Sequence, residues 1–356
     1  MRVALTHAYC WPDVRRGGER LLHELAGALA RRGHVVTILS SASRPGRSAE
    51  DGVLVVRLRS PRGSGLAQEL RFSRTVLGPL LGSRFDVVHS LGIGDASASI
   101  VASRAHRSRR TVFTHLGIPI RSWYEQQPDW RWQRFVAGHI DVYGCLSAHA
   151  GDTFEAGFGR RAARTPGGVR LARFAPAEHR AGPPTLLYSG ALTEPRKRVG
   201  DLLEAVALLA ATEPSLRLWL SGPGDASTLL AAAPPAARER TEVLPLGSPD
   251  LSATYGRAWV TVLPSVYEAF GLVLLESLAC GTPVVAVDHS ALPELVAPGI
   301  GELAAPEDPA SLADACRRAL RLAREPGIAD RCRAAAEPHD WVLAVAPRIE
   351  ALYEGA

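Results

Sequence analysis

The stretch PSVYEAFGLVLLESLACGTPVVAVDHSALPELV occupies residues 264–296 and decides how the rest of the chain is interpreted. An apolar strand ends at Pro264, a loop then carries Glu268, and Gly271 opens an apolar helix. The first turn of such a helix has free backbone N–H groups that bind phosphate, and a glycine lets the phosphate approach closely. Glu276 follows inside the helix. This order predicts an anion site with a carboxylate on each side of it.

We expect the two carboxylates to have different partners. Glu276 would accept hydrogen bonds from two neighbouring hydroxyls of a ribose, whereas Glu268 would face a sugar on the other side of the phosphates. By position alone, Glu268 is equally an ordinary loop residue and Glu276 an exposed helix residue. The predicted binding residues of this stretch are Glu268, Ala269, Phe270, Gly271, Leu272, Val273 and Glu276.

Apolar runs of strand length alternate with helical patterns along both halves of the chain. The strand patterns are residues 2–8, 34–40, 53–59, 85–90 and 111–115, and then residues 185–190, 216–222, 241–247, 258–265 and 282–288. Helical spacing of apolar residues is clearest in residues 17–33, which end at a glycine. Such alternation predicts mainly parallel sheets with helices on both faces.

The alternation breaks at residues 166–184, PGGVRLARFAPAEHRAGPP, where Pro and Gly cluster as in a linker. The predicted fold class is therefore α/β, with two doubly wound, Rossmann-like domains facing a central cleft, because ligands of such sheets bind at the carboxyl ends of the strands. We place the first domain at residues 1–170 and the second at residues 171–340. Residues 341–356 are expected to form a C-terminal helix that packs back on the first domain.

The composition excludes several classes of protein. The net charge of +5 is spread along 356 residues without a basic run or a recognition motif, so nucleic acid is not expected as a partner. The charge fits a solvated surface or attraction to an anionic ligand or membrane surface. Five dispersed cysteines suggest a reducing compartment, and no apolar window approaches the length of a membrane span. We expect a cytoplasmic protein, with peripheral contact at the inner membrane face as an alternative.

Residues 264–296 resemble the Glu-x7-Glu signature of glycosyltransferase family 4, whose retaining enzymes have the two-domain GT-B fold. The matching positions are Pro264, Ser265, Glu268, Phe270, Gly271, Glu276, Gly281, Pro283, Val284 and Val285. The resemblance extends over nearly the whole chain, although Gly167 and Arg170 replace the usual Asn and Asp of the linker. It implies that the first domain binds the acceptor and the second binds the nucleotide-sugar.

The stretch EPRKRVGD contains Lys197, the only lysine among 41 lysines and arginines. By itself it would be a solvated residue before a helix. The resemblance places it at a lysine that contacts the donor diphosphate, where a compact cation suits a crowded pocket better than a planar guanidinium. The family's neighbouring arginine is replaced by Ala191, so Arg196 or Arg198 would supply the second charge.

Three residues of the first domain complete the predicted site. His115 ends a strand and, by resemblance, lies near the transferred sugar, although an isolated histidine is more often part of a core. Gly17 and Gly18 hold the place of a Gly-Gly loop that faces the phosphates and the acceptor. His7 and His89 also end strands and are weaker candidates for the cleft.

The resemblance implies an enzyme that moves a sugar from a nucleoside diphosphate-sugar to an acceptor hydroxyl with retention at the anomeric carbon. Its catalytic residues would be His115, Glu268 and Lys197. No Asp-x-Asp motif or metal-ligand cluster is present in the sequence, so we expect no metal and no cofactor besides the co-substrate. The acceptor is expected to be a small molecule, a glycan or a lipid-linked sugar.

Residues 121–135, RSWYEQQPDWRWQRF, combine aromatics with arginines. They suit a membrane-facing segment, a wall for the acceptor or the ordinary packing of a long connection. Two alternatives to the enzyme remain at this point: a nucleotide-sugar epimerase of the same fold, and an inactive homologue that serves as a partner subunit, which Ala191 suggests.

Overall fold

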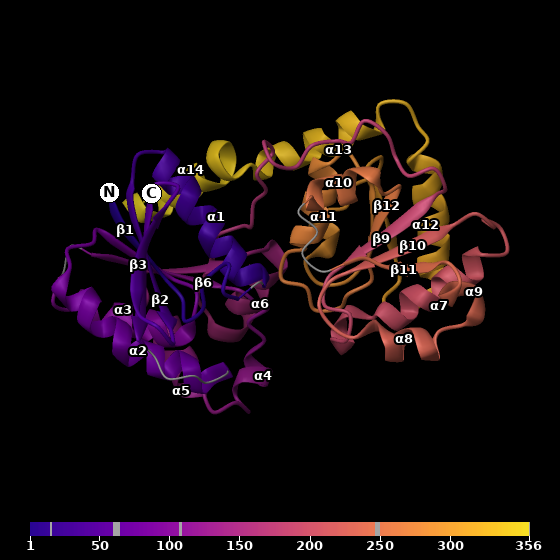
Figure 1. Cartoon of the computed structure of the whole chain (residues 1–356). Coiled ribbons are helices and arrows are strands. Elements are labelled where there is room, and N and C mark those ends of the chain that lie inside the picture. Colours follow the sequence, from indigo (N-terminus) through magenta and orange to yellow (C-terminus); the bar gives the residue numbers. More distant parts are fainter. Residues whose placement is uncertain (15, 60–64, 107–108, 246–249, 356) are drawn as a thin grey trace. The chain divides into compact units, whose positions relative to one another are not determined.

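The structure is a computed structural model of the whole chain, and it describes every residue except 15, 60–64, 107–108, 246–249 and 356 (Figure 1). The chain forms two compact units. Unit 1 comprises Met1–Gly168 with Trp341–Ala356, and unit 2 comprises Val169–Asp340. The chain thus passes into unit 2 slightly before the predicted boundary at residue 170, and it leaves unit 2 at residue 340.

Unit 1 is built on an eight-stranded sheet in the order β3-β4-β2-β1-β5-β6-β7-β8. Its strands are β1 (Arg2–Thr6), β2 (Val35–Ala42), β3 (Gly46–Glu50), β4 (Val53–Arg59), β5 (Val87–Ser90), β6 (Arg110–His115), β7 (Val142–Cys145) and β8 (Ala163–Arg164). Its helices are α1 (Gly17–Arg31), α2 (Gly65–Gly82), α3 (Ile93–Ser103), α4 (Arg121–Tyr124), α5 (Trp130–His139), α6 (Ala148–Phe158) and α14 (Ala346–Glu354), the last preceded by a π-helical turn, Trp341–Val345. The chain runs from β1 outward to β4 and then returns to β5, so the strand order reverses between β1 and β5. Ligands of open α/β sheets bind at such a reversal.

Helices cover both faces of this sheet (Figure 1). The helices α2, α3 and α5 pack against one another on one face, while α1 and α14 lie on the other. The central strands are therefore buried on both sides and consist of apolar runs, as parallel strands require. Among the strands in the described residues of this unit, β3 alone runs antiparallel to its neighbour.

The sequence analysis did not predict the strand β3. It pairs with β4 through a tight turn in which Asp51 and Gly52 both have positive φ, 48° and 78°. Asp-Gly is the preferred pair for a two-residue hairpin of this kind, because both positions need the left-handed region. The strand itself contains no apolar run, which is why its pattern gave no signal.

Unit 2 is built on a six-stranded sheet in the order β11-β10-β9-β12-β13-β14, with all pairs parallel. Its strands are β9 (Thr185–Ser189), β10 (Arg217–Ser221), β11 (Thr241–Val243), β12 (Val260–Leu263), β13 (Val284–Val287) and β14 (Gly301–Ala304). Its α-helices are α7 (Val199–Leu209), α8 (Ala226–Ala232), α9 (Pro235–Arg238), α10 (Leu251–Arg257), α11 (Leu272–Ala279), α12 (Pro309–Leu322) and α13 (Ile328–Ala336), and Pro195–Lys197, Leu292–Glu294 and Glu337–His339 are 3-10 turns. Here the order reverses between β9 and β12. The strand predicted over residues 241–247 is shorter than expected, and residues 246–247 lie outside the described part.

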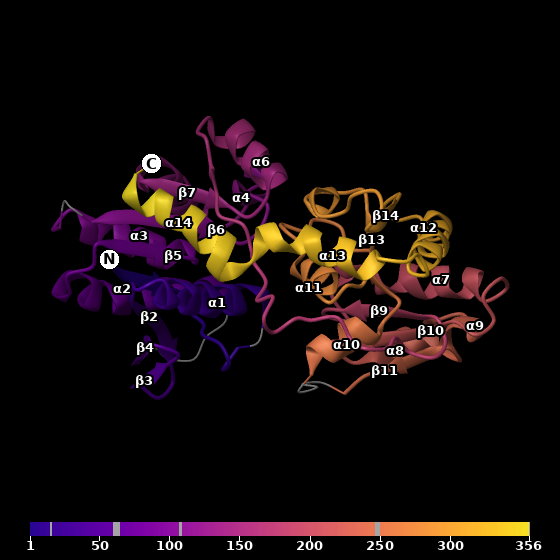
Figure 2. The same cartoon turned by 90° about the horizontal axis from the view of Figure 1, so that it is seen from above.

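Two helical layers enclose the sheet of unit 2. The helices α7, α9 and α12 pack together on one face, and α10, α11 and α13 pack on the other (Figure 2). Both predicted domains therefore have the expected doubly wound α/β design.

The C-terminal helix α14 packs on unit 1, as the sequence analysis expected. The carboxylate of Glu350 contacts Arg32 Nε at 2.6 Å and His34 Nε2 at 2.9 Å. The Tyr353 hydroxyl lies 2.8 Å from Nδ1 of His89, whose Nε2 lies 2.7 Å from the hydroxyl of Thr114. His89 uses both ring nitrogens within the core, and burial lowers its pKa to about 3. Its weak assignment to a cleft was wrong, because this neutral histidine ties α14 to the sheet.

Candidate active site

The strand-order reversal of unit 2 brings together two loops that are far apart in the sequence. The loop after β9 carries Lys197, and the loop after β12 carries Glu268. The Lys197 ammonium forms an ion pair with Glu268 Oε1, and each side chain is only 13% exposed. Nη1 of Arg196 lies 3.1 Å from the same carboxylate oxygen. Two cations thus converge on one carboxylate at the carboxyl ends of the strands.

Backbone hydrogen bonds hold these loops side by side. The N–H of Val266 donates to the carbonyl of Arg196 at 2.9 Å, and the N–H of Ala291 donates to the carbonyl of Glu268 at 3.3 Å. The Glu268 loop is therefore fixed on one side by the loop after β9 and on the other by the loop after β13.

The two candidate arginines beside Lys197 differ in what they touch. Burial would lower the pKa of Arg196, but the carboxylates of Glu268 and Glu194 outweigh it and raise that pKa, so the guanidinium stays charged. The Arg198 side chain turns to its own helix, where Nε lies 2.9 Å from Asp201 Oδ2. Of the two, Arg196 is the one that stands with Lys197 against Glu268.

The helix α11 begins next to this cluster. Gly271 caps it with φ of +99°, and a Cβ there would lie 3.0 Å from Cδ2 of Leu292, so both conformation and space favour glycine. The N–H of Leu274 already bonds the Gly271 carbonyl at 2.9 Å. The N–H groups of Leu272 and Val273 come before this first intrahelical donor, and N–H groups in that position of a helix can bind an anion.

The remaining predicted residues of this stretch are mostly buried. Ala269 and Phe270 are buried beside the cap of α11. Glu276 is also buried, on the helix α11, and it already has an interaction within the protein. The alternative in which Glu276 is an exposed helix residue is therefore wrong.

In unit 1, His115 ends β6 and is buried. Its Nε2 lies 2.9 Å from the Tyr124 hydroxyl, and its Nδ1 has no hydrogen-bond partner in the part of the chain that the structure describes. Burial lowers the pKa of His115 to about 4, so the ring is neutral near pH 7. A neutral, incompletely paired imidazole can exchange a hydrogen bond with a sugar hydroxyl.

The segment of residues 121–135 is connected to this histidine. It contributes Tyr124 through the short helix α4, while Trp123 and Trp132 are 47% and 40% exposed. Two other aromatics of the segment contact rings of the unit, Trp130 that of Phe158 and Phe135 that of His139. The segment therefore packs on the unit through three aromatics and leaves two partly exposed.

The glycines of the predicted Gly-Gly loop lie elsewhere than expected. Gly17 and Gly18 form the first turn of α1 instead of a loop before it. A Cβ at Gly18 would come within 2.6 Å of Cδ1 of Leu116, so the helix approaches the segment after β6 too closely for a side chain. This contact sets α1 beside the residues that follow His115.

Sequence reasoning missed a buried polar cluster at the strand-order reversal of unit 1. Nε2 of His7, at the end of β1, lies 3.6 Å from Oε1 of Glu19 on α1. Oδ2 of Asp95, in the first turn of α3, accepts from the Thr6 hydroxyl at 2.6 Å. Within the described residues, His7 Nδ1, Glu19 Oε2 and Asp95 Oδ1 have no hydrogen-bond partner. A Cβ at Gly92 would overlap Asp95 Oδ1 and lie 3.5 Å from His7 Nδ1.

The charges of this cluster are set by burial and by pairing. Burial alone would raise the pKa of Glu19, but the nearby His7 ring and the hydrogen bonds from Arg16 lower it to about 2. Burial raises the pKa of Asp95 to about 7, against the attraction of His7 and the hydrogen bond from Thr6. The strand-terminal His7 was the available signal in the sequence, while Asp95 was not among the residues that the sequence analysis named.

The raised pKa of Asp95 predicts how a substitution changes stability with pH. An aspartate titrates near 3.8 when unfolded and near 7 here, so folding disfavours the charged form and its cost grows as pH rises from about 4 to about 7. Asp95→Asn should raise the free energy of unfolding by about 2 kcal/mol at pH 8, less than the full shift corresponds to because the amide needs its own partners. Urea unfolding at pH 8 and pH 4.5 measures this, and the gain should shrink at the lower pH. The exposed Asp152→Asn is the control, and an equal gain at both pH values would contradict the explanation.

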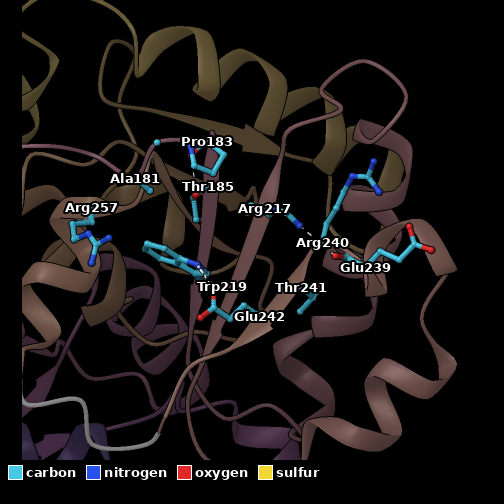
Figure 3. Close-up of a pocket in the computed structure, with 11 residues that line it drawn as sticks. Ala181, Pro183, Thr185, Arg217, Trp219, Glu239, Arg240, Thr241, Glu242 and Arg257 are labelled. Carbon is cyan, nitrogen blue, oxygen red and sulfur yellow. Dashed lines mark hydrogen bonds between the residues drawn. The ribbon is translucent and has the colours of Figure 1, made fainter.

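A separate cavity of about 330 Å³ lies in unit 2 near the amino ends of its strands, opposite to the end that carries Lys197 and Glu268 (Figure 3). Its lining includes Thr185, Arg217 and Thr241, the first residues of β9, β10 and β11. Figure 3 shows Trp219 beside Glu242, with the indole N–H donating to the carboxylate at 3.0 Å. Because these residues lie at or near the amino ends of the strands, this cavity is distinct from the Lys197–Glu268 cluster.

Two features are absent from the described part of the chain. It contains no group of three or more His, Cys, Asp or Glu side chains that could hold a metal ion. None of the helices in the described residues is both long and apolar enough to cross a membrane.

The comparisons with known proteins agree with the fold. Residues 15–173 match the model of Glycosyltransferase Family 4, and residues 183–321 match that of Glycosyl transferases group 1. The chain is 29% identical over 378 residues to the phosphatidyl-myo-inositol mannosyltransferase of Mycobacterium leprae, covering 99% of this chain and 96% of that protein.

Solved structures share the fold at low sequence identity. The sucrose-phosphate synthase of Thermosynechococcus elongatus superposes with a TM-score of 0.81 at 20% identity, covering 99% of this chain and 98% of that one. The Anabaena protein HepE, crystallised with UDP, superposes with a TM-score of 0.76 at 17% identity over the whole of both chains.

The two Rossmann-like units and these matches define a glycosyltransferase of the GT-B class. Within that class, the chain belongs to glycosyltransferase family 4.

Proposed function

We propose that this enzyme transfers a sugar from a nucleoside diphosphate-sugar to an acceptor hydroxyl with retention at the anomeric carbon. The observation that carries the proposal is the meeting of Lys197 and Arg196 with Glu268 beside the N-terminus of α11. The bond between the anomeric carbon and the diphosphate breaks, and its electron pair leaves with the diphosphate. The acceptor oxygen forms the new bond to the anomeric carbon and releases its proton.

Unit 2 is proposed to bind the donor. Lys197 and Arg196 would neutralise the diphosphate together with the N–H groups of Leu272 and Val273, because negative charge accumulates there as the bond breaks. Glu268 would orient the sugar by accepting bonds from its hydroxyls. Arg196 would thereby supply the second cation that Ala191 does not.

Glu276 is proposed to bind the ribose, and it would do so by exchanging the interaction that it has within the protein. Arg198, which pairs with Asp201, would contribute charge to the diphosphate site without direct contact.

Unit 1 is proposed to bind the acceptor. His115, neutral and with one ring nitrogen unpaired, would hydrogen-bond the transferred sugar, and Gly17 and Gly18 would let the acceptor and phosphates approach the start of α1. The exposed Trp123 and Trp132 would face the acceptor's rings or an anionic lipid surface. A reducing, cytoplasmic location is supported by the five cysteines, all free and buried.

The test is direct binding and turnover. We expect the purified protein to bind at least one of a panel of UDP-, GDP- and ADP-sugars in calorimetry, and to release the free nucleoside diphosphate when an acceptor is added. Proton NMR of the product should show the anomeric configuration of the donor. If no nucleotide-sugar of the panel binds, the proposal fails, and an inverted product would overturn retention alone.

A further inference from the structure

The loop that carries Glu268 adopts a backbone conformation that its own sequence does not favour. Tyr267 has φ of +58°, in the left-handed region that residues other than glycine enter at a cost of roughly 1–3 kcal/mol. Its side chain is 44% exposed, so burial of the ring offsets little of that cost. Such a conformation persists only where the surroundings over-determine it.

The contact that acts on Tyr267 itself comes from His289, which follows β13. The N–H of Tyr267 donates to Nδ1 of His289 at 3.2 Å, and the two rings meet edge to face with centroids 4.8 Å apart. The hydroxyl of Ser290 lies 2.5 Å from the same nitrogen. Because Nδ1 accepts from a backbone N–H, it carries no proton, and the proton of the neutral ring is on Nε2.

The loop after β13 contacts the backbone on both sides of the Tyr267–Glu268 peptide. His289 accepts from the N–H of Tyr267, and Ala291 donates to the carbonyl of Glu268. Ser290, between these two contacts, is itself left-handed with φ of +56°. Two residues with left-handed backbones, Tyr267 and Ser290, therefore both contact Nδ1 of His289. The residue after Tyr267 is Glu268, whose carboxylate pairs with Lys197.

We propose that His289 is a positioning residue for the donor site. Its Nδ1 holds Tyr267 in the left-handed conformation, and that conformation directs the Glu268 carboxylate to Lys197 and Arg196. The effect on catalysis rests on the donor role proposed above for Glu268, whereas the effect on the loop does not.

Two substitutions separate the hydrogen bond from the bulk of the ring. His289→Ala removes the acceptor, whereas His289→Asn retains an oxygen close to the position of Nδ1. The exposed His179, which lies in unit 2 beside its sequence neighbour Glu178, provides the matched control His179→Ala.

Amide hydrogen exchange of the peptide that covers residues 264–271 tests the effect on the loop. We expect about fivefold faster exchange at Tyr267 in His289→Ala, since one ordinary hydrogen bond is lost, and near-native protection in His289→Asn. Unchanged exchange in the folded His289→Ala variant would overturn the proposal. If that variant does not fold, His289→Asn decides: native exchange supports the proposal, and lost protection in a folded protein overturns it.

Kinetics with the donor that the panel identifies tests the effect on the site. His289→Ala should raise the donor KM about five- to tenfold and leave the acceptor KM unchanged, with recovery in His289→Asn. A general loss of structure would instead lower kcat through the fraction of active enzyme and leave both KM values as they are. If the wild type binds no nucleotide-sugar, the proposed function fails, while hydrogen exchange still decides the role of His289.

Discussion

Lys197→Ala is expected to lower kcat/KM for the donor by about 10²–10³, which is typical of losing one group that stabilises charge in a transition state. The lysine is mostly buried and lies against Glu268 at the start of the donor site. Its removal takes away a cation from the departing diphosphate. It also leaves Glu268 with Arg196 as its remaining partner, so that the carboxylate repels the incoming phosphates more strongly.

Steady-state release of nucleoside diphosphate measures this loss, and calorimetry measures the donor affinity. Lys197→Arg retains the charge without the compact shape and should fall between the wild type and Lys197→Ala. Arg161→Ala, at a side chain that is 91% exposed, is the control. Native turnover and native donor affinity in Lys197→Ala would show that the lysine pairs with Glu268 without taking part in donor binding or transfer.

Glu268→Gln is expected to separate transfer from nucleotide binding. In the structure, the carboxylate occupies both Lys197 and Arg196, so it competes with a diphosphate for the same cations. Removing its charge should leave the affinity for the free nucleoside diphosphate unchanged or tighten it a few-fold. Transfer should nevertheless fall about 10²-fold, because the sugar loses a charge-assisted hydrogen bond.

The two effects of Glu268→Gln are read in separate experiments. Calorimetry with the nucleoside diphosphate gives the first, and initial rates with the intact donor give the second. Glu178→Gln, at a side chain that is 91% exposed, is the control. If affinity for the nucleoside diphosphate and the transfer rate fall in parallel, Glu268 maintains the phosphate site instead of orienting the sugar.

The sequence predicted the doubly wound fold because the signals for it are local: apolar runs, helical spacing and the Gly271 cap. The pairing of Lys197 with Glu268 is not local, since it depends on β9 and β12 being neighbours in the sheet. The resemblance therefore assigned both residues to the site, but it did not predict that they contact each other.

The residues that the sequence analysis misjudged, left uncertain or did not name share a physical cause. His89 and His7 both end parallel strands, and only the tertiary structure shows that Tyr353 satisfies one while the other remains incompletely paired. Asp95 gave no signal in the sequence, because its burial depends on residues far away in the chain, such as Thr6. His289 acts through the backbone of Tyr267. No pattern of residue types in the sequence indicates that this tyrosine has a positive φ.

The path of the chain through the two units has a consequence for synthesis. Unit 2 is one continuous segment, whereas unit 1 is divided around it and receives α14 only after residue 340. On the ribosome, unit 2 can therefore complete its fold while unit 1 still lacks the helix that supplies Tyr353 to His89 and Glu350 to Arg32. The usual order, in which the N-terminal domain matures first, is thereby reversed for the final step. Until α14 is translated, unit 1 therefore exposes the surface that this helix later covers.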